Sequence, residues 1–219
     1  QMSPITSTST STNTPLMHNE ILTKEQHSLL PLVAKFKRNF GLVGGTAIAL
    51  HIGHRESIDF DMFNPDEFSN ANIRSVFRRA GRTIEVLRAD TGQFTFIIDG
   101  VHLTFFQYPY PIEYVESFDS YAKVPTLLTL AAMKAFALGK RSKWKDYVDL
   151  YFILKDFHAI DEILVKAEAL FAGEFNGKLF RQQLSYFDDI NYSESIVFRP
   201  GFEVPDEEIR KALTEYSLA

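Results

Sequence analysis

The sequence predicts an α+β fold, in which a mixed sheet with flanking helices is followed by a helical region at the C-terminus. Between residues 41 and 108, segments with the period of a strand alternate with segments with the period of a helix. After residue 124, apolar residues recur at helical spacing. A hydrophobic fraction of 45% in 219 residues is sufficient for a packed core.

Changes of period and turn residues predict the elements in chain order. Apolar residues at helical spacing from Leu22 to Phe40 predict a first helix, bent at Pro31. A strand, a helix, a strand, a helix and three hairpin-linked strands are then expected at residues 41–43, 46–54, 57–63, 69–81, 82–89, 92–99 and 101–108. Further helices are expected at residues 125–139, 142–157, 161–172, 178–187 and 206–219.

Composition divides the chain into three parts. Residues 1–16 are rich in Ser and Thr and lack apolar periodicity, so we expect a disordered tail there. We expect an α/β domain at residues 17–123 and a helical domain at residues 124–219, with the boundary near Lys123. The sequence contains no internal repeat.

Charge and composition exclude several classes of protein. A formal net charge of −5 argues against non-specific coating of nucleic acid. The absence of cysteine excludes disulfides, thiolate metal sites and a cysteine nucleophile. No apolar run approaches the roughly 18 to 20 residues that a membrane-spanning helix needs, and no secretion signal is apparent. We therefore expect a cytoplasmic protein without a membrane partner.

Two aspartates stand one residue apart in an otherwise apolar strand. Because side chains alternate along a strand, Asp59 and Asp61 are expected about 6.5 Å apart on one face, with Ile58, Phe60 and Met62 on the other. Paired carboxylates raise each other's pKa unless a cation lies between them, and Mg²⁺ binds one or two carboxylates together with water and substrate phosphate. The pair predicts a Mg²⁺ site, with Mn²⁺ as a substitute; an edge strand with solvated aspartates is the alternative.

A glycine pair precedes these aspartates at a strand-to-helix turn. Gly44 and Gly45 would let the backbone approach a phosphate closely, and the first N–H groups of the helix, with the hydroxyl of Thr46, would supply hydrogen-bond donors. Ser57 shares the face of Asp59 by alternation, so its hydroxyl can reach a phosphate or a metal-bound water. Glycines also permit tight turns of no catalytic significance, but a phosphate site close to a metal pair favours nucleotide binding.

The segment GGTAIALHIGHRESIDFDMF resembles the signature of the DNA polymerase β-type nucleotidyltransferase superfamily, in which Gly-Gly or Gly-Ser opens a helix and Asp-x-Asp lies on the next strand. Together with LLTLAAMKAFALGKRSKWKDYVDLYFIL, it resembles the AbiEii-type abortive-infection nucleotidyltransferases, the toxins of bacterial toxin–antitoxin pairs. The resemblance covers about residues 40 to 155. It implies a polymerase β-like nucleotidyltransferase domain at residues 17–123 and NTP as the substrate.

The second of these segments carries residues that the resemblance assigns to the active site. It implies that Lys134 contacts the nucleotide phosphates and that Asp146 holds this lysine or acts near the reacting hydroxyl. Asp149 follows Asp146 by three residues, on the same side of the helix. Nucleotide binding is the role expected for Asp149, Lys145 and Arg55. Arg55 belongs to the pattern His-Arg-x-Ser-x-Asp. Solvated Lys–Asp pairs at a helix junction are the alternative interpretation.

One position departs from the superfamily. Most of its members carry a third carboxylate on a neighbouring strand, and the corresponding residue here is Thr104. Glu85 and Asp99 are candidates to replace that carboxylate from adjacent strands. A one-metal enzyme, a two-metal enzyme with an unusual ligand and a nucleotide binder without turnover all stay open.

Two further groups of residues have two interpretations each. His51 and His54 lack a third ligand at a defined spacing, so we expect structural histidines in place of a zinc site. Five arginines would either line a groove for a polyanionic acceptor or form a solvated face: Arg74, Arg78, Arg79, Arg82 and Arg88.

The sequence thus predicts a Mg²⁺-dependent nucleotidyltransferase that moves NMP from an NTP to a hydroxyl of tRNA or protein. The resemblance implies the toxin of a type IV toxin–antitoxin or abortive-infection system, with a cognate antitoxin as partner. Two other functions are compatible with the same residues. One is a non-catalytic module that binds a nucleotide or a partner, and the other is a transferase that modifies an aminoglycoside antibiotic.

Overall fold

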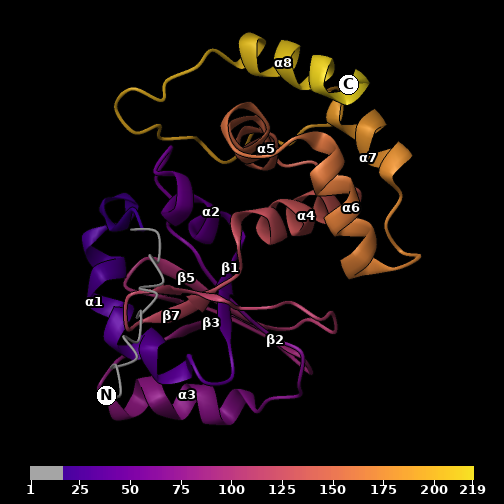
Figure 1. The fold of residues 1–219 in the computed structure, drawn as a ribbon. Helices are drawn as coiled ribbons and strands as arrows, with labels where there is room; N and C mark the ends of the chain where they lie inside the picture. The colour runs from indigo at the N-terminus through magenta and orange to yellow at the C-terminus, as the bar shows by residue number, and fades with distance from the viewer. Residues whose placement is uncertain (1–16) are drawn as a thin grey trace, which may run out of the picture.

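The computed structural model describes residues 17–219, so the tail expected at residues 1–16 lies outside the described residues. The described residues form a seven-stranded mixed sheet with helices on both faces and a helical region beyond one of them (Figure 1). The strand order is β3-β4-β5-β2-β1-β7-β6. The α+β fold class predicted from the sequence is confirmed.

The elements follow the expected order, with two additional strands. The strands are β1 Gly41–Val43, β2 Phe60–Asn64, β3 Glu85–Asp90, β4 Gln93–Ile98, β5 Val101–Gln107, β6 Glu116–Phe118 and β7 Ala122–Val124. The helices are α1 Lys24–Val33, α2 Gly44–Ile52, α3 Asn70–Arg79, α4 Leu127–Leu138, α5 Trp144–Asp156, α6 Ile160–Phe171, α7 Gly177–Leu184 and α8 Asp206–Leu218. The sequence does not predict β6 and β7, which have three residues each and no glycine pair after them such as the one that marks the end of the equally short β1.

Two expected details are wrong. The helix α1 ends two residues after Pro31, and a 3-10 turn at Ala34–Phe36 follows in place of the helix expected up to Phe40. A proline removes one backbone hydrogen bond, which weakens a helix near its end. The strand β2 begins only at Phe60, so Ile58 does not share the buried face and is 49% exposed.

One face of the sheet is apolar and packs against α3. Phe77 of α3 contacts Phe96 of β4 edge-on, with 5.0 Å between the ring centroids. The ring centroids of Phe36 and Phe105 of β5 are 4.8 Å apart. The alternate side chains of three strands are buried on this face: Phe60, Met62, Phe94, Phe96, Ile98, Val101, Leu103 and Phe105. Because the side-chain period of a strand is two, the residues between them point to the opposite face.

The helices that follow β7 lie over this opposite face (Figure 1). The helix α4 packs against α2 and α6, and α5 packs against α2 and α8. Lys123, where we expect the domain boundary, lies inside β7, which pairs with both β1 and β6. The division into two domains stays a prediction.

Candidate active site

Polar side chains lie side by side on the face of the sheet that is covered by α4 and α5. We call this face of the sheet the site face. In the parallel pair of β2 and β5, Asp61 lies directly opposite Thr104. Asp59, immediately before β2, lies against His102 of β5, with 3.3 Å between Asp59 Oδ1 and His102 Nδ1. The two aspartates therefore share one face of the sheet, and a histidine and a threonine lie beside them.

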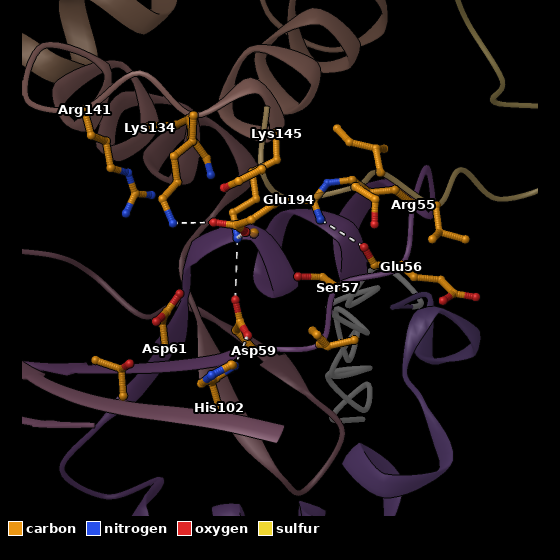
Figure 2. Close-up of a pocket in the computed structure, with 18 of the residues that line it drawn as sticks. Arg55, Glu56, Ser57, Asp59, Asp61, His102, Lys134, Arg141, Lys145 and Glu194 are labelled. Carbon is orange, nitrogen blue, oxygen red and sulfur yellow. Dashed lines mark hydrogen bonds and ion pairs between the residues drawn. The ribbon is translucent and has the colours of Figure 1, made fainter. Parts of the chain in front are cut away.

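A cavity of about 730 Å³ opens above this part of the sheet (Figure 2). Asp59 and Asp61 point up into it from the sheet, towards cationic side chains that come down from the helical region (Figure 2). Lys145 Nζ lies 3.5 Å from Asp59 Oδ2. The cationic residues that line the cavity are Arg55, Lys134, Arg141, Lys143 and Lys145. We call this space the first cavity; its charges suit a polyanionic ligand.

The glycine pair makes room for two charged side chains at the start of α2. Gly44 has a φ of +73°, and a Cβ atom there would collide with Asp61 Oδ2. A Cβ atom at Gly45 would lie 2.5 Å from Arg55 Nη2, which is too close for two non-bonded atoms. Larger residues at either position would push Asp61 or Arg55 away from the first turn of α2, whose N–H groups favour anions.

The hydroxyl of Thr46 faces the protein interior. Thr46 is 1% exposed, its Oγ1 lies 2.9 Å from Ser57 Oγ, and it donates a hydrogen bond to the carbonyl oxygen of Asp59. Gln26 Nε2 donates to the carbonyl oxygen of Ser57 at 2.8 Å. Thr46 thus holds the segment that precedes β2, whereas Ser57 itself lines the first cavity.

Asp149 is the centre of a buried cluster of charges. It is fully buried, and its carboxylate accepts hydrogen bonds from His54 Nε2 at 2.8 Å and from Arg55 Nε and Nη2 at 2.7 and 2.9 Å. Lys134 Nζ lies 3.1 Å from the same carboxylate. Although burial opposes ionisation, the charges of Arg55 and Lys134 hold the pKa of Asp149 well below its usual range. Asp149 therefore positions these two cations while lying behind the cavity wall.

Asp146 connects this cluster to Arg141, which lines the first cavity. It is also fully buried, and it accepts hydrogen bonds from Lys134 Nζ at 2.7 Å and from Arg141 Nε at 3.0 Å. Lys134 is 5% exposed between two carboxylates. Burial disfavours its ammonium form, but the charges of Asp146 and Asp149 outweigh this and raise the pKa of Lys134. Lys134 is thus fixed as a cation at the wall of the first cavity.

Asp61 carries unfavourable electrostatics. Burial raises the pKa of its carboxyl above the ordinary value, and the neighbouring Asp59 carboxylate raises it further. Arg141, Lys145 and Lys134 act in the opposite direction without cancelling the shift. A positive charge between Asp59 and Asp61 would relieve this repulsion.

The two aspartates fit a divalent cation that has few protein ligands. Within residues 17–219, no group of three or more His, Cys, Asp or Glu side chains is placed to hold a metal ion. A cation at Asp59 and Asp61 would therefore complete its shell with water and phosphate oxygens, as Mg²⁺ does in nucleotide sites. The missing Cβ of Gly44 leaves the space that the carboxylate of Asp61 uses.

The loop between α7 and α8 crosses the first cavity and carries a residue that the sequence does not single out. Backbone hydrogen bonds hold this loop on both sides of the cavity, from Asn191 N to Ser142 O at 2.7 Å and from Glu56 N to Val197 O at 2.9 Å. We call residues 191–197 the crossing segment. No periodic pattern marks it in the sequence, so nothing there predicts contact with the site.

Glu194 of the crossing segment enters the cavity as an anion. Its carboxylate pairs with Lys143 and Lys145, the second of which also faces Asp59 (Figure 2). Partial burial acts to raise its pKa, but the hydrogen bonds from Lys143 and Lys145 outweigh burial and lower the pKa of Glu194 to about 2. Glu194 therefore places a negative charge against Lys143 and Lys145 inside the first cavity.

Other residues considered from the sequence lie away from the first cavity. Glu85 is on the exposed edge strand β3, and Asp99 pairs with Arg82 at 2.7 Å, so neither is placed to replace the third carboxylate. The five arginines lie on α3, the turn after it and β3, and none lines the first cavity, which supports a solvated face. His51 Nε2 bonds the carbonyl oxygen of Pro125 at 3.0 Å, whereas His54 Nε2 bonds Asp149, so the two ring nitrogens have different partners.

The fold and the pairing of a glycine turn with Asp-x-Asp define a protein with the nucleotidyltransferase fold. MenT4, a nucleotidyltransferase toxin from Mycobacterium tuberculosis, is similar to this chain with a TM-score of 0.59 and 14% identity, over 87% of this chain and 80% of that chain. JHP933 from Helicobacter pylori has a TM-score of 0.55 and 15% identity, over 90% and 92% of the two chains.

Sequence comparison defines the family more narrowly. The profile of the family described as nucleotidyl transferase AbiEii toxin, type IV toxin–antitoxin system, matches residues 32–215. The chain therefore belongs to the AbiEii nucleotidyltransferase toxin family, as its two sequence segments indicate. The uncharacterized protein aq_aa25 of Aquifex aeolicus is 29% identical over 206 residues, which is 89% of this chain and 97% of that protein. No helix in the described part of the chain is both long and apolar enough to cross a membrane.

Proposed function

We propose that this toxin is a Mg²⁺-dependent enzyme that transfers a nucleoside monophosphate from an NTP to a hydroxyl of tRNA or protein. The observation that carries this proposal is the first cavity, where two carboxylates on the sheet face five cationic side chains from the loops and helices above. Carboxylates and cations on opposite walls suit a triphosphate that binds with a divalent cation. In the cell, a cognate antitoxin would oppose this activity.

The transfer would break a phosphoanhydride bond of the NTP and form a phosphodiester bond to the acceptor. The acceptor oxygen bonds to the α-phosphorus of the NTP, the bond from that phosphorus to the bridging oxygen breaks, and pyrophosphate leaves. The proton of the hydroxyl passes to solvent. A Mg²⁺ ion held by Asp59 and Asp61 would supply charge stabilisation to the transferring phosphate, with Mn²⁺ as a substitute.

The remaining roles follow from where each side chain lies. The first N–H groups of α2, at Gly44 and Gly45, and the hydroxyl of Ser57 would contact phosphate oxygens. Gly45 and Ser57 line the first cavity, and Gly44 lies against Asp61. Lys134 and Lys145 would neutralise charge on the leaving pyrophosphate. Three buried residues would hold these groups in place through hydrogen bonds and ion pairs. Thr46 holds Ser57, Asp146 holds Lys134, and Asp149 holds Arg55 and Lys134.

Labelling with each NTP tests this proposal directly. The protein, Mg²⁺ and one NTP labelled at its α-phosphate are incubated with total tRNA or with total cell protein, and label transfer and pyrophosphate are measured. Asp59→Ala should lower transfer by at least about a hundredfold, whereas Asp188→Ala, at an exposed position, should not. Transfer that persists in Asp59→Ala would refute the assignment.

Thr104 gives a specific reason to keep the non-catalytic module as the second candidate. It stands where the superfamily resemblance implies a third carboxylate, so the sheet offers two acidic ligands where three are expected. Tight NTP binding without pyrophosphate release on tRNA, protein or an aminoglycoside would favour that module. Pyrophosphate release with an aminoglycoside alone would identify an antibiotic-modifying enzyme instead.

A further inference from the structure

The backbone of the crossing segment is attached to the rest of the protein only at its two ends. Among residues 17–219, the backbone groups of residues 192–196 form one hydrogen bond, from Ser193 N to Asn191 Oδ1 at 2.8 Å, which lies within the segment itself. Residues 192–195 are exposed, whereas Ile196 packs against the apolar core. An exposed stretch with so few hydrogen bonds opens at a low cost in free energy. Residues 192–195 are therefore the part of the segment that can move.

Two side chains hold this part in place, and the first is Glu194. Its carboxylate pairs with Lys143 and Lys145 inside the first cavity. The side chains of all three residues are partly exposed, at 41%, 37% and 19% respectively. Ion pairs that solvent reaches are weak, so a ligand with more negative charge can replace the carboxylate.

The second side chain is Tyr192, which is held outside the first cavity. Its ring centroid lies 5.4 Å from that of Trp144, and its Oη accepts a hydrogen bond from Arg210 Nη2 of α8 at 2.9 Å. The guanidinium carbon of Arg210 lies 5.4 Å from the Trp144 ring and 5.6 Å from the Tyr192 ring, within the range of cation–π attraction. We call Trp144, Tyr192 and Arg210 the Tyr192 cluster.

The two contacts are linked through the start of α5. Trp144 stands between Lys143 and Lys145 in the sequence, so three consecutive residues hold Tyr192 and Glu194. Under the proposed function, a triphosphate in the first cavity competes with Glu194 for the two lysines. Glu194 lies only two residues from Tyr192 in the movable part, so its displacement disturbs the Tyr192 cluster as well. Phosphate binding and closure of the segment are therefore coupled in free energy.

We propose that the crossing segment is an autoinhibitory lid, which the Tyr192 cluster holds closed over the first cavity and which the phosphate chain of the NTP opens. This inference rests on the proposed function for the identity of the ligand. The closed lid lowers the apparent affinity for phosphates, because only the open fraction of the molecules binds them. Tyr192 does not line the cavity, so it controls this affinity through the position of Glu194.

Trp144 makes the state of the lid measurable without a label. It is the only tryptophan of the chain and is 4% exposed, so quenching of its fluorescence by acrylamide reports whether Tyr192 still covers the indole. The probe ligand is inorganic tripolyphosphate with Mg²⁺. It carries the phosphate chain of an NTP, but it has no base that absorbs the exciting light.

Tripolyphosphate should raise the quenching of Trp144 in the wild type to the level of ligand-free Tyr192→Ala. In calorimetry, Tyr192→Ala should bind tripolyphosphate about two- to fivefold more tightly than the wild type, because the partly exposed contacts of the lid no longer compete. Tripolyphosphate should add no further quenching in this variant.

Two further variants separate the lid from a general effect of the substitution. Tyr192→Phe keeps the ring beside Trp144 and should behave like the wild type in both measurements. Tyr186→Ala is the matched control, since Tyr186 is 48% exposed, close to the 44% of Tyr192, and also lies outside the first cavity. Circular dichroism and thermal unfolding report whether each variant is folded.

Three results would overturn the inference. Tripolyphosphate binding without a change in the quenching of Trp144 would mean that the lid stays closed, and the proposed function would stand without it. Equal or weaker tripolyphosphate affinity in Tyr192→Ala would mean that Tyr192 does not oppose binding. If ligand-free quenching rises in Tyr192→Ala but neither protein binds tripolyphosphate, the phosphate assignment of the first cavity is wrong, and the proposed function fails together with the inference.

Discussion

Thr104 and Asp61 lie directly opposite each other in the parallel pair of β2 and β5, on the face of the sheet that lines the first cavity. Thr104 Oγ1 is 3.4 Å from Thr95 Oγ1 of the next strand, so two hydroxyls follow Asp61 across the sheet. The superfamily resemblance implies a carboxylate at this position. The pair therefore marks the place where a metal ligand can be added by one substitution.

Thr104→Asp should strengthen binding of a divalent cation. A third carboxylate adds a ligand and negative charge to the site, which should raise Mn²⁺ affinity at least about tenfold. Without metal, the added repulsion should lower the thermal midpoint below that of the wild type. Calorimetric Mn²⁺ titration checks the first effect, with Ser120→Asp, at an exposed position, as control. Unchanged Mn²⁺ affinity would mean that Thr104 does not face the cation.

Lys134→Met should destabilise the protein strongly. The substitution leaves the fully buried carboxylates of Asp146 and Asp149 without one of their cations, which typically costs about 3–5 kcal/mol. Urea unfolding measures the change in free energy. Lys155→Met, at an exposed position of α5, should cost less than about 1 kcal/mol. A cost below about 1 kcal/mol for Lys134→Met would show that this cluster is solvated.

Stability should fall as the pH drops below about 6.5 because of His54. Burial lowers the pKa of its imidazole below the ordinary value, despite the hydrogen bond to Asp149. At low pH the unfolded chain therefore takes up a proton at His54 that the folded chain does not. The contribution of His54 to the free energy of unfolding is thus present above the unfolded pKa and is lost as the pH falls below it.

His54→Gln should reduce that pH dependence by up to about 1.4 kcal/mol per pH unit. The free energy of unfolding is measured by urea titration at several values between about pH 8 and pH 5. His158→Gln, outside the buried charge cluster, should keep the slope of the wild type. A slope that survives in His54→Gln would assign the pH dependence to other groups.

Glu194→Gln should strengthen NTP binding. The carboxylate of Glu194 holds Lys143 and Lys145, and a triphosphate must compete with it for both lysines. Exposed ion pairs contribute up to about 1 kcal/mol, so the affinity should rise about two- to fivefold. Calorimetry with a non-hydrolysable NTP analogue measures the effect, with Glu215→Gln of α8 as control. Weaker binding would show that Glu194 positions the lysines for the phosphate.

The parts of the site that the sequence could predict are those with a regular period or a motif. Alternation along the strand places Asp59 and Asp61 on one face. The superfamily resemblance puts Thr104 at the position of the third carboxylate, and Thr104 lies directly opposite Asp61. The family resemblance implies that Lys134 and Asp146 belong together, and they lie 2.7 Å apart. The assignment of these residues to catalysis stays a prediction.

The rest depends on contacts that only the folded chain defines. The contact of His102 with Asp59 requires the register of β5 against β2, which neither strand encodes alone. Glu194 comes from an aperiodic loop more than a hundred residues after Asp59. The inward direction of the Thr46 hydroxyl depends on the packing of the first turn of α2 against the segment before β2.

The central claim is that Asp59 and Asp61 together bind a divalent cation. Electron paramagnetic resonance of free Mn²⁺ measures this directly, with wild type and Asp59→Asn/Asp61→Asn titrated in the presence of a non-hydrolysable NTP analogue. We expect the double variant to stay folded and to lose Mn²⁺ affinity by at least about tenfold. Equal Mn²⁺ affinity in the two proteins would contradict it.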